Sequence, residues 1–576
     1  MAAACLIALL CASHASAASP VYVFPIPGSK VAPPGAQIVF RGVSVNHIGS
    51  ITVTGSRSGR HSGRLRGDSD GNGGSFLPSS GFTPGETVTV STHLNIEGSG
   101  KGKWSFRVAN PGPVLPNVRW SPAPRTSGDT WFFHSRHDLQ PAAVHVNTNG
   151  QTAPGDIFVG PQNGPLQDGP EILDNNGNLI FFKDLPGNDS PSDVRVQKLY
   201  GQPVLTWWQG YVSDGVGVGE DVINDTSYRV THVIQAADGL HADLHEFEIT
   251  PHNTALLTIE YPVHWDDSSV GGSRNGMAFD SVVQEIDIKT GLLLFQWDSL
   301  DHVRLSDSYQ TIKNSPLFDF FHVNSVEPMS DGTLLISSRN TWSAYKVDHN
   351  TGRVIWVLGG KRSSFKMLGG SAFAFQHDVR VHAPNDSTVT VFDDENGAFQ
   401  AGRQARALTL SINTATMTAT KVTEYDHSPP LLPRAEGNYQ LLGNGDGFVG
   451  WGLAPYFSEY TPAGTLVYDA RFVDSNSSYT AWRFQWTGTP HTLPAIAAST
   501  SGSTTFAFVS WNGATNVASW QLLGGSSSSH LHKIGSRVAK TSFETRFAVP
   551  AEQFVAVQAL DSNGHVMATS STIHPK

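Results

Sequence analysis

Cysteine is almost absent from this 576-residue sequence, which has only two. Both, Cys5 and Cys11, lie in an N-terminal apolar stretch that leads into an Ala-Ser-Ala motif at residues 15–17, which fits a signal-peptidase site. Removal of this segment would leave a mature chain without a thiol, which excludes disulfides, zinc–thiolate sites and cysteine nucleophiles. The sequence therefore predicts a signal peptide over residues 1–18 and a secreted, extracellular protein.

Long apolar runs and blocks of positive charge are also missing. After the N-terminal segment, no stretch approaches the ~18 consecutive apolar residues that a membrane-spanning helix requires, so no membrane span is expected. The 38 Lys and Arg residues are outnumbered by 49 Asp and Glu residues, and the net charge of −11 argues against a nucleic-acid partner. The composition does not predict the oligomeric state.

Helical periodicity is missing as well, and short alternating runs separated by 57 Gly and 34 Pro residues predict an all-β chain. Residues 19–120 contain runs such as "QIVFRGVSV" and "ETVTVSTHL", which are typical of a small β-sandwich, and they end in a Pro-rich linker. Residues 488–576, with "TTFAFVSWNG" and "QFVAVQALDSNG", resemble an immunoglobulin-like or fibronectin-like sandwich. Residues 121–487 remain between these two expected domains.

This central segment is repetitive. Three hairpins begin with a histidine, namely "HEFEITPHNTALLT" from His245, "HVNSVEPMSDGTLLIS" from His322 and "HDVRVHAPNDSTVTVF" from His377, and three further hairpins match in position without the histidine. A second hairpin-like element with a turn glycine follows most of them; Gly177, Gly239, Gly291 and Gly352 are 52 to 62 residues apart, and the 112 residues from Gly352 to Gly464 leave room for one copy without the glycine. Two hairpins supply the four strands of a propeller blade, so six units predict a six-bladed β-propeller over residues 121–487.

The repeat also predicts a site. The first strand of each propeller blade lines the central channel, so His245, His322 and His377 are expected to converge there from three blades. Arg339 closes the hairpin that His322 opens, which returns it to the same end beside His322 and Asn324. An arginine fork and an amide donor suit a tetrahedral oxyanion, and histidine can shuttle a proton or attack as a nucleophile.

Aromatic residues near these positions could hold a planar ring, and the candidates are Trp207, Trp208, Phe321 and Trp342. The pocket therefore suits an aryl ester of an oxyanion. Each feature also has a purely structural interpretation, because isolated histidines often satisfy backbone groups and aromatic residues often fill cores. Three histidines could also hold zinc, but Arg339 beside a cation argues against it, so neither a metal nor a cofactor is predicted.

The motifs "LHEFEIT", "FFHVNSVEPMSDGTLLISSRNTWSAYKVDHNTGRVIWVLGG", "FQHDVRV" and "GNGDGFVGWG" resemble the arylsulfotransferase family, the PAPS-independent aryl sulfate sulfotransferases. The resemblance covers roughly residues 130–475. It implies a six-bladed propeller that transfers a sulfuryl group from a phenolic sulfate donor to a phenol acceptor. The implied reaction is ping-pong.

The resemblance also implies roles for individual residues. His377 in "FQHD" matches the histidine that forms a sulfohistidine intermediate. His322 and Asn324 in "HVNS", with Arg339 in "SSRN", match the sulfate-binding residues, and His245 in "LHEF" matches a third histidine. Either His245 or His322 could protonate the departing phenolate, and the sequence does not distinguish them.

Two other functions remain open. A non-catalytic secreted propeller that binds glycans or proteins would tolerate replacement of all three histidines. A quinoprotein-like oxidoreductase is suggested by "YKVDHNTGRVIWV", which resembles the blade-docking repeat of that class, although six units and a histidine–arginine channel argue against it.

Overall fold

The computed structural model describes residues 20–118, 124–312, 316–382, 384–394, 404–473 and 475–576. About half of the chain is strand (49%) and only 3% is helix, so the prediction of an all-β protein is confirmed. The expected signal peptide and both cysteines lie outside the described residues. In the part of the chain that the structure describes, no helix is long and apolar enough to cross a membrane.

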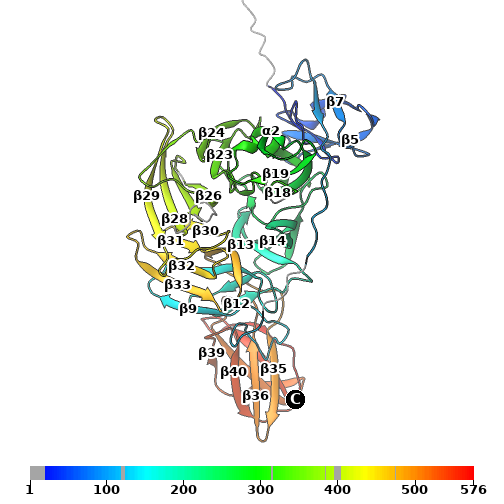
Figure 1. Cartoon of the computed structure of the whole chain (residues 1–576). Coiled ribbons are helices and arrows are strands. Elements are labelled where there is room, and N and C mark those ends of the chain that lie inside the picture. Colours follow the sequence, from blue (N-terminus) through cyan, green and yellow to red (C-terminus); the bar gives the residue numbers. More distant parts are fainter. Residues whose placement is uncertain (1–19, 119–123, 313–315, 383, 395–403, 474) are drawn as a thin grey trace, which may run out of the picture.

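Six sheets of four or five strands make up the middle of the chain (Figure 1). In hydrogen-bonded order, the first sheet contains β12 (Leu179–Phe182), β11 (Glu171–Leu173), β10 (Asp156–Gln162) and β34 (Ser477–Phe484). The second sheet contains β13 (Ser190–Leu199), β14 (Gln202–Ser213), β15 (Val216–Asn224) and β16 (Val230–Ile234). The third sheet contains β17 (Phe247–Ile249), β18 (Thr254–Trp265), β19 (Gly276–Asp287) and β20 (Leu293–Asp298). The fourth sheet contains β21 (Val323–Pro328), β22 (Leu334–Ser338), β23 (Ser343–Val347) and β24 (Val354–Gly359). The fifth sheet contains β25 (Lys366–Leu368), β29 (Thr418–Asp426), β28 (Arg406–Asn413), β27 (Thr388–Asp393) and β26 (His377–His382). The sixth sheet contains β30 (Asn438–Leu441), β31 (Gly447–Gly450), β32 (Tyr456–Tyr460), β33 (Leu466–Phe472) and β9 (Val144–Asn149).

Strands from the two ends of this segment complete the first and last sheets. β9 pairs with β33 at one edge of the sixth sheet, and β34 pairs with β10 in the first sheet. Each sheet contacts the next one in turn, mostly through an edge strand: β34 contacts β13, β13 contacts β17, β18 contacts β21, β21 contacts β26, β26 contacts β30, and β30 contacts β34. The sheets therefore follow one another around a closed series of contacts.

Strands in the middle of these sheets are buried on both faces. In β19 and β22 the burial is almost continuous along the strand, rather than alternating, because neighbouring sheets cover both sides. Short helices connect some strands: η1 (Ser268–Val270), α2 (Ser299–His302) and η2 (Leu305–Asp307).

The N-terminal part contains two sheets that share one hydrophobic core. Burial alternates along β8 (Lys103–Arg107), with Trp104 and Phe106 inside, as expected for a strand with one solvated face. The sheets are β1 (Tyr22–Phe24), β2 (Ile38–Arg41), β6 (Gly73–Pro78) and β5 (Gly63–Gly67); and β4 (Gly59–His61), β3 (Thr52–Gly55), β7 (Thr87–Ser91) and β8, with helix α1 (Val45–Ile48) beside them.

The C-terminal part is built in the same way around Trp520 and Val557. Its sheets are β35 (Ala495–Ser501), β36 (Thr504–Ser510) and β40 (Thr545–Pro550); and β38 (His530–Lys533), β37 (Ser519–Ser527), β41 (Phe554–Leu560) and β42 (Val566–Thr569), with β39 (Val538–Ala539) paired to β37.

Both end parts are anchored to the central sheets by hydrogen bonds. The backbone N–H and the hydroxyl of Ser69 donate to the carboxylate of Asp287 on β19 at 2.8 and 2.9 Å. At the other end, the hydroxyl of Tyr228 donates to the carbonyl of Gly513 at 2.8 Å. Such contacts fix each end part against the central sheets without a disulfide.

Candidate active site

The three histidines of the repeat come together in the structure. His245 lies two residues before β17, His322 immediately before β21, and His377 is the first residue of β26. All three are buried, with exposures of 4%, 0% and 0%. The ring centroids of His245 and His322 are 4.7 Å apart, and those of His245 and His377 are 6.3 Å apart.

Local backbone irregularities direct these side chains. His322 has a φ of +58°, a left-handed conformation in which histidine is among the more tolerated residues. The pairing of β21 with β22 shifts register between Val323 and Ser325, and that of β26 with β27 shifts after His377. Such β-bulges re-aim side chains next to functional sites.

Each histidine is held at its Nδ1 atom by a carboxylate. The Nδ1 of His322 lies 2.7 Å from Oδ2 of Asp319, and the Nδ1 of His377 lies 2.6 Å from Oδ2 of Asp394. The Nδ1 of His245 is hydrogen-bonded to Asp243. Holding Nδ1 in this way fixes each ring and leaves its Nε2 for other partners.

The carboxylates Asp319 and Asp394 were not identified from the sequence. Asp394 directly follows β27, whose Phe392 pairs with His377. A hairpin returns to the end where it began, which is the same reasoning that predicted Arg339 beside His322, so this signal was present in the sequence.

His245 and His322 form part of a continuous hydrogen-bonded chain. Their Nε2 atoms are 3.2 Å apart, so the chain runs from Asp243 through both imidazoles to Asp319. Three hydrogen bonds need three protons, whereas two neutral imidazoles supply two. All three hydrogen bonds can therefore form at once only when the chain takes up one additional proton, and the chain reaches solvent through Asp319, whose side chain is 27% exposed.

His377 has the features of a buried nucleophile. Its Nε2 is buried and has no hydrogen-bond partner among the described residues. Burial, followed by the charges of Arg339 and the other two histidines, lowers the pKa of His377 well below its ordinary 6.5. With Nδ1–H directed at Asp394, the neutral imidazole carries a lone pair on Nε2.

The electrostatics of the carboxylates and of His322 complement this arrangement. Burial raises the pKa of Asp394 well above its usual value, and Asp393 adds to the effect. The charge of Arg339 acts in the opposite direction on the pKa of Asp394 and favours the carboxylate form, which can accept the Nδ1–H of His377. Burial, together with the charge of Arg339, lowers the pKa of His322 to about 4 against the opposing effect of Asp319.

Arg339 directly follows β22 and lies beside His322. Its backbone N–H donates to the carbonyl of His322 at 3.0 Å, its Nη2 lies 3.3 Å from Asp319, and its Nε donates to Asn340 at 3.1 Å. The guanidinium carbon is 4.5 Å from the centroid of the Phe375 ring. Among the described residues its Nη1 has no hydrogen-bond acceptor, so one edge of a nearly buried guanidinium is left for a ligand.

Asn324 contacts protein rather than open space. Its Nδ2 donates to the carbonyl of Gln376, the residue before His377, at 2.6 Å. The structure thus gives Asn324 a contact that positions the start of β26.

The predicted ring-binding tryptophans fall into two groups. Trp207 and Trp208 are 0% and 1% exposed and belong to hydrophobic cores, with the Trp208 Nε1 donating to the carbonyl of Ala242 at 3.0 Å. The structure therefore gives these two indoles a packing role on β14, and their part in substrate binding stays a prediction. Trp342 is half-buried and stacks on Tyr309, with ring centroids 3.6 Å apart.

Two aromatic residues that the sequence did not indicate also border the site. Phe375 lies under Arg339, and the Tyr479 ring centroid is 5.4 Å from that of His245 and 6.3 Å from that of His377. Tyr479 is on β34, so its position could be predicted only by knowing that this strand closes the first sheet.

Buried ion pairs tie the strands of the site together. Glu246, which follows His245, pairs through one oxygen with Arg195 of β13 at 2.6 Å and through the other with Arg380 of β26 at 2.8 Å. Arg195 and Arg380 lie in two different sheets and Glu246 directly precedes a strand of a third, β17, so the ion pairs fix the relative positions of His245 and His377. Loss of one partner would leave an unpaired buried charge.

Residues 195–473 match the model of the arylsulfotransferase (ASST) family. Over these residues the chain belongs to the arylsulfotransferase family. The matched region contains the three histidines and Arg339, whereas Tyr479 lies beyond it. Membership of the arylsulfotransferase family indicates sulfuryl transfer from an aryl sulfate donor to a phenol acceptor.

No curated protein matches the sequence. Solved structures that resemble the chain include a protein of unknown function from Bacteroides caccae (12% identity, 57% of this chain and 98% of that chain, TM-score 0.35). A streptogramin B lyase is 11% identical, with 58% of this chain and 88% of that chain covered and a TM-score of 0.31. A putative 6-phosphogluconolactonase from Bacteroides fragilis is 12% identical, with 76% of this chain and 98% of that chain covered and a TM-score of 0.29. TM-scores this low do not indicate a shared site or activity.

The geometry of the site also bears on the alternative of a metal centre. Within the described ranges, no group of three or more His, Cys, Asp or Glu residues is arranged to hold a metal ion. The nearby guanidinium of Arg339 also suits an anion in this position rather than a cation.

Proposed function

We propose that the chain is a PAPS-independent aryl-sulfate sulfotransferase that works by a ping-pong reaction through a sulfohistidine at His377. The observation that carries the proposal is the buried Nε2 of His377, which has no partner among the described residues, lies close enough to Arg339 for that charge to depress its pKa, and is oriented by Asp394. A neutral, oriented imidazole beside an anion-binding group is the arrangement that attack on a sulfate ester requires.

In the first half-reaction, the Nε2 lone pair of His377 attacks the sulfur of the aryl sulfate. The N–S bond forms as the S–O bond to the aryl group breaks, and the oxygen keeps the electron pair. Negative charge grows on the departing oxygen and is spread over the sulfuryl oxygens, as in phosphoryl transfer. Arg339 stabilises the sulfuryl oxygens, and Asp394 accepts the hydrogen bond from the Nδ1–H, which becomes more acidic as Nε2 is sulfated.

The chain from Asp243 to Asp319 supplies the proton for the departing phenolate. A bound sulfate ester brings negative charge next to His322 and Arg339, which raises the pKa of His322 and favours proton uptake on binding. The extra proton of the chain then passes to the phenolate oxygen from His245 or His322. In the second half-reaction the acceptor phenol returns a proton to the chain, its oxygen attacks sulfur, and the S–N electron pair returns to Nε2.

Steady-state kinetics with two varied substrates test this proposal. Nitrophenolate release from p-nitrophenyl sulfate should depend on added phenol, and double-reciprocal plots at several phenol concentrations should be parallel. Release that requires PAPS, or lines that intersect, would contradict it. No phenol-dependent release from any of several aryl sulfates would favour a binding function for the site.

The acid limb of the pH profile is expected below pH 6.5. Only neutral His377 can attack, and burial lowers its pKa. As the pH falls through 6.5 the imidazole therefore stays neutral, and it is protonated only when the pH reaches the lowered pKa. The profile of kcat/KM for p-nitrophenyl sulfate reports this pKa in the free enzyme, provided that nitrophenolate is read after alkaline quenching. A limb at or above pH 6.5 would contradict a buried neutral nucleophile.

We also propose that the six central sheets are the blades of a six-bladed β-propeller over residues 121–487, between sandwich domains at 19–120 and 488–576. The closed series of sheet contacts and the strands β9 and β34 that complete the end sheets support this division. Secretion after cleavage near residue 18 belongs to the same proposal. N-terminal sequencing of protein recovered from the medium of an expressing host tests it.

A further inference from the structure

A cleft of about 790 Å³ lies between the N-terminal sheets and the hairpin of β18 and β19. Two backbone hydrogen bonds fix its walls: His264 donates to the carbonyl of Asn110 at 2.9 Å, and Gly112 donates to the carbonyl of Pro262 at 2.7 Å. Ligand pockets are commonly of this size and often lie where two structural units meet. None of the residues that line it belongs to the histidine site.

Positive charge gathers in this cleft, although the chain as a whole carries −11. Lys30, Arg107 and Arg274 line it, against a single carboxylate, Asp266. All three cations are exposed, and none forms an ion pair within 4 Å to a carboxylate in the described part of the chain. Cations from two separate parts of the chain thus face one space, with Asp266 near Arg274 and Asp301 near Lys30 as the carboxylates that act on them electrostatically.

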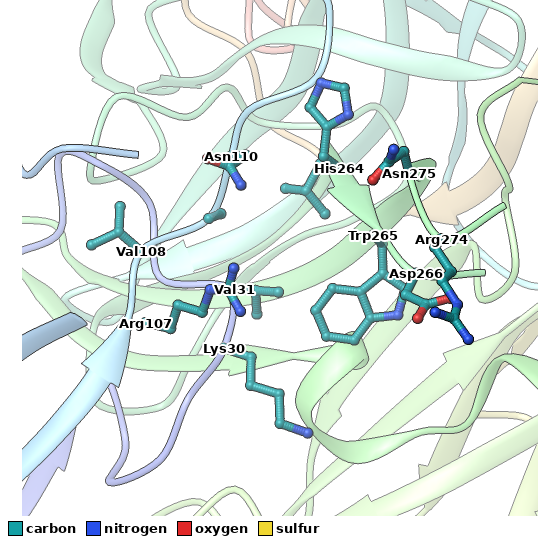
Figure 2. Close-up of a pocket in the computed structure, with 12 residues that line it drawn as sticks. Lys30, Val31, Arg107, Val108, Asn110, His264, Trp265, Asp266, Arg274 and Asn275 are labelled. Atoms are coloured by element: carbon teal, nitrogen blue, oxygen red, sulfur yellow. The ribbon is translucent and has the colours of Figure 1, made fainter. Parts of the chain in front are cut away.

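The cleft also offers an aromatic face and two amides. Figure 2 shows the indole of Trp265 in the middle of the lining, with Arg107 and Lys30 on one side, Arg274 on the other, and the amides of Asn110 and Asn275 above it. The half-buried indole of Trp265 offers a flat aromatic face, against which the apolar face of a ligand ring can pack. An asparagine amide both donates and accepts hydrogen bonds, which suits hydroxyl groups.

We propose that this cleft binds an acidic oligosaccharide, with sulfate or carboxylate groups at Arg107, Lys30 and Arg274, a sugar ring on Trp265, and hydroxyl groups at the two asparagines. Cations on both sides of the indole require a ligand with anionic groups at more than one point, which a single aryl sulfate lacks. The site is separate from the proposed sulfuryl transfer and does not depend on it.

Calorimetric titration of the full chain at low salt with a heparin-derived tetrasaccharide, and with a carboxylated tetragalacturonate, tests the proposal. At least one should bind. The variant Lys30→Ala/Arg107→Ala/Arg274→Ala should bind about tenfold more weakly or not at all, since each exposed charge contact contributes modestly. The control Arg60→Ala/Arg64→Ala/Lys103→Ala removes the same charge from exposed positions of the N-terminal sheets and should bind as the wild type does.

Trp265 distinguishes a ring-binding cleft from a purely electrostatic surface. Trp265→Ala should weaken binding, and Trp265→Phe, which keeps an aromatic face, should retain most of it. Thermal melting checks that each variant is folded. Phenol-dependent sulfuryl transfer should be unchanged in all of them.

Several results would overturn the proposal. They are failure of both acidic tetrasaccharides to bind, an equal loss of binding in the cleft and control variants, and equal binding of Trp265→Ala. Binding of neutral maltotetraose, a short single-stranded oligonucleotide or p-nitrophenyl sulfate to the same residues as strongly as the acidic sugars would also overturn it.

Discussion

Replacement of His377 by alanine is expected to abolish phenol-dependent nitrophenolate release from p-nitrophenyl sulfate. The substitution removes the lone pair that forms the N–S bond, and the other two histidines use Nε2 in the hydrogen bond between them. Loss of a covalent nucleophile costs on the order of 10⁶ in rate in well-studied hydrolases, which a steady-state assay records as complete loss. Initial rates at saturating donor and phenol measure the effect.

His382→Ala provides the matched control for this experiment. His382 ends the same strand, β26, and its Nε2 lies 3.0 Å from the hydroxyl of Thr390, away from the histidine cluster. The control should retain activity. Normal activity in folded His377→Ala would remove His377 from the mechanism and make His322 and His245 the candidates.

Replacement of Arg339 by lysine is expected to lower kcat/KM by about 10²–10³, the usual cost of removing one preorganised donor from a developing anion. Lysine retains the positive charge but not the planar fork that can contact two oxygens of a tetrahedral anion. It also cannot reproduce the contacts of Arg339 with Asp319 and Asn340 at the same time. The same variant should bind inorganic sulfate, as a competitive inhibitor, more weakly.

Arg353→Lys is a suitable control, because Arg353 is exposed in the turn that leads to β24. It should leave kcat/KM unchanged. An Arg339→Lys variant with the kinetics of the wild type would show that the guanidinium does not contact the transferred group.

The sequence predicted the histidine cluster because a repeat places equivalent residues at equivalent heights. His245, His322 and His377 all stand at the start of the first strand in their units, so periodicity alone brought them together. Arg339 followed from the geometry of a hairpin. The same rule applied to β27 would have predicted Asp394 beside His377.

The positions that the sequence did not predict have physical causes. Trp207 and Trp208 were both predicted as substrate-binding residues, but they are adjacent on β14, so their side chains point to opposite faces. Stacked sheets cover both faces of a middle strand, and both indoles are therefore buried in cores. The position of Asn324 depends on a register shift in β21 that no sequence pattern marks, and that of Tyr479 depends on the closure of the first sheet by β34.

Trapping of the sulfated enzyme tests whether His377 carries the sulfuryl group between donor and acceptor. The protein is mixed with p-nitrophenyl sulfate without an acceptor, quenched at alkaline pH because a sulfated imidazole is labile in acid, digested, and analysed by mass spectrometry. We expect one added sulfuryl group on the peptide that contains His377, and removal of this group when phenol is added before quenching. A sulfuryl group on another residue, or continued turnover with no sulfated peptide, would contradict it.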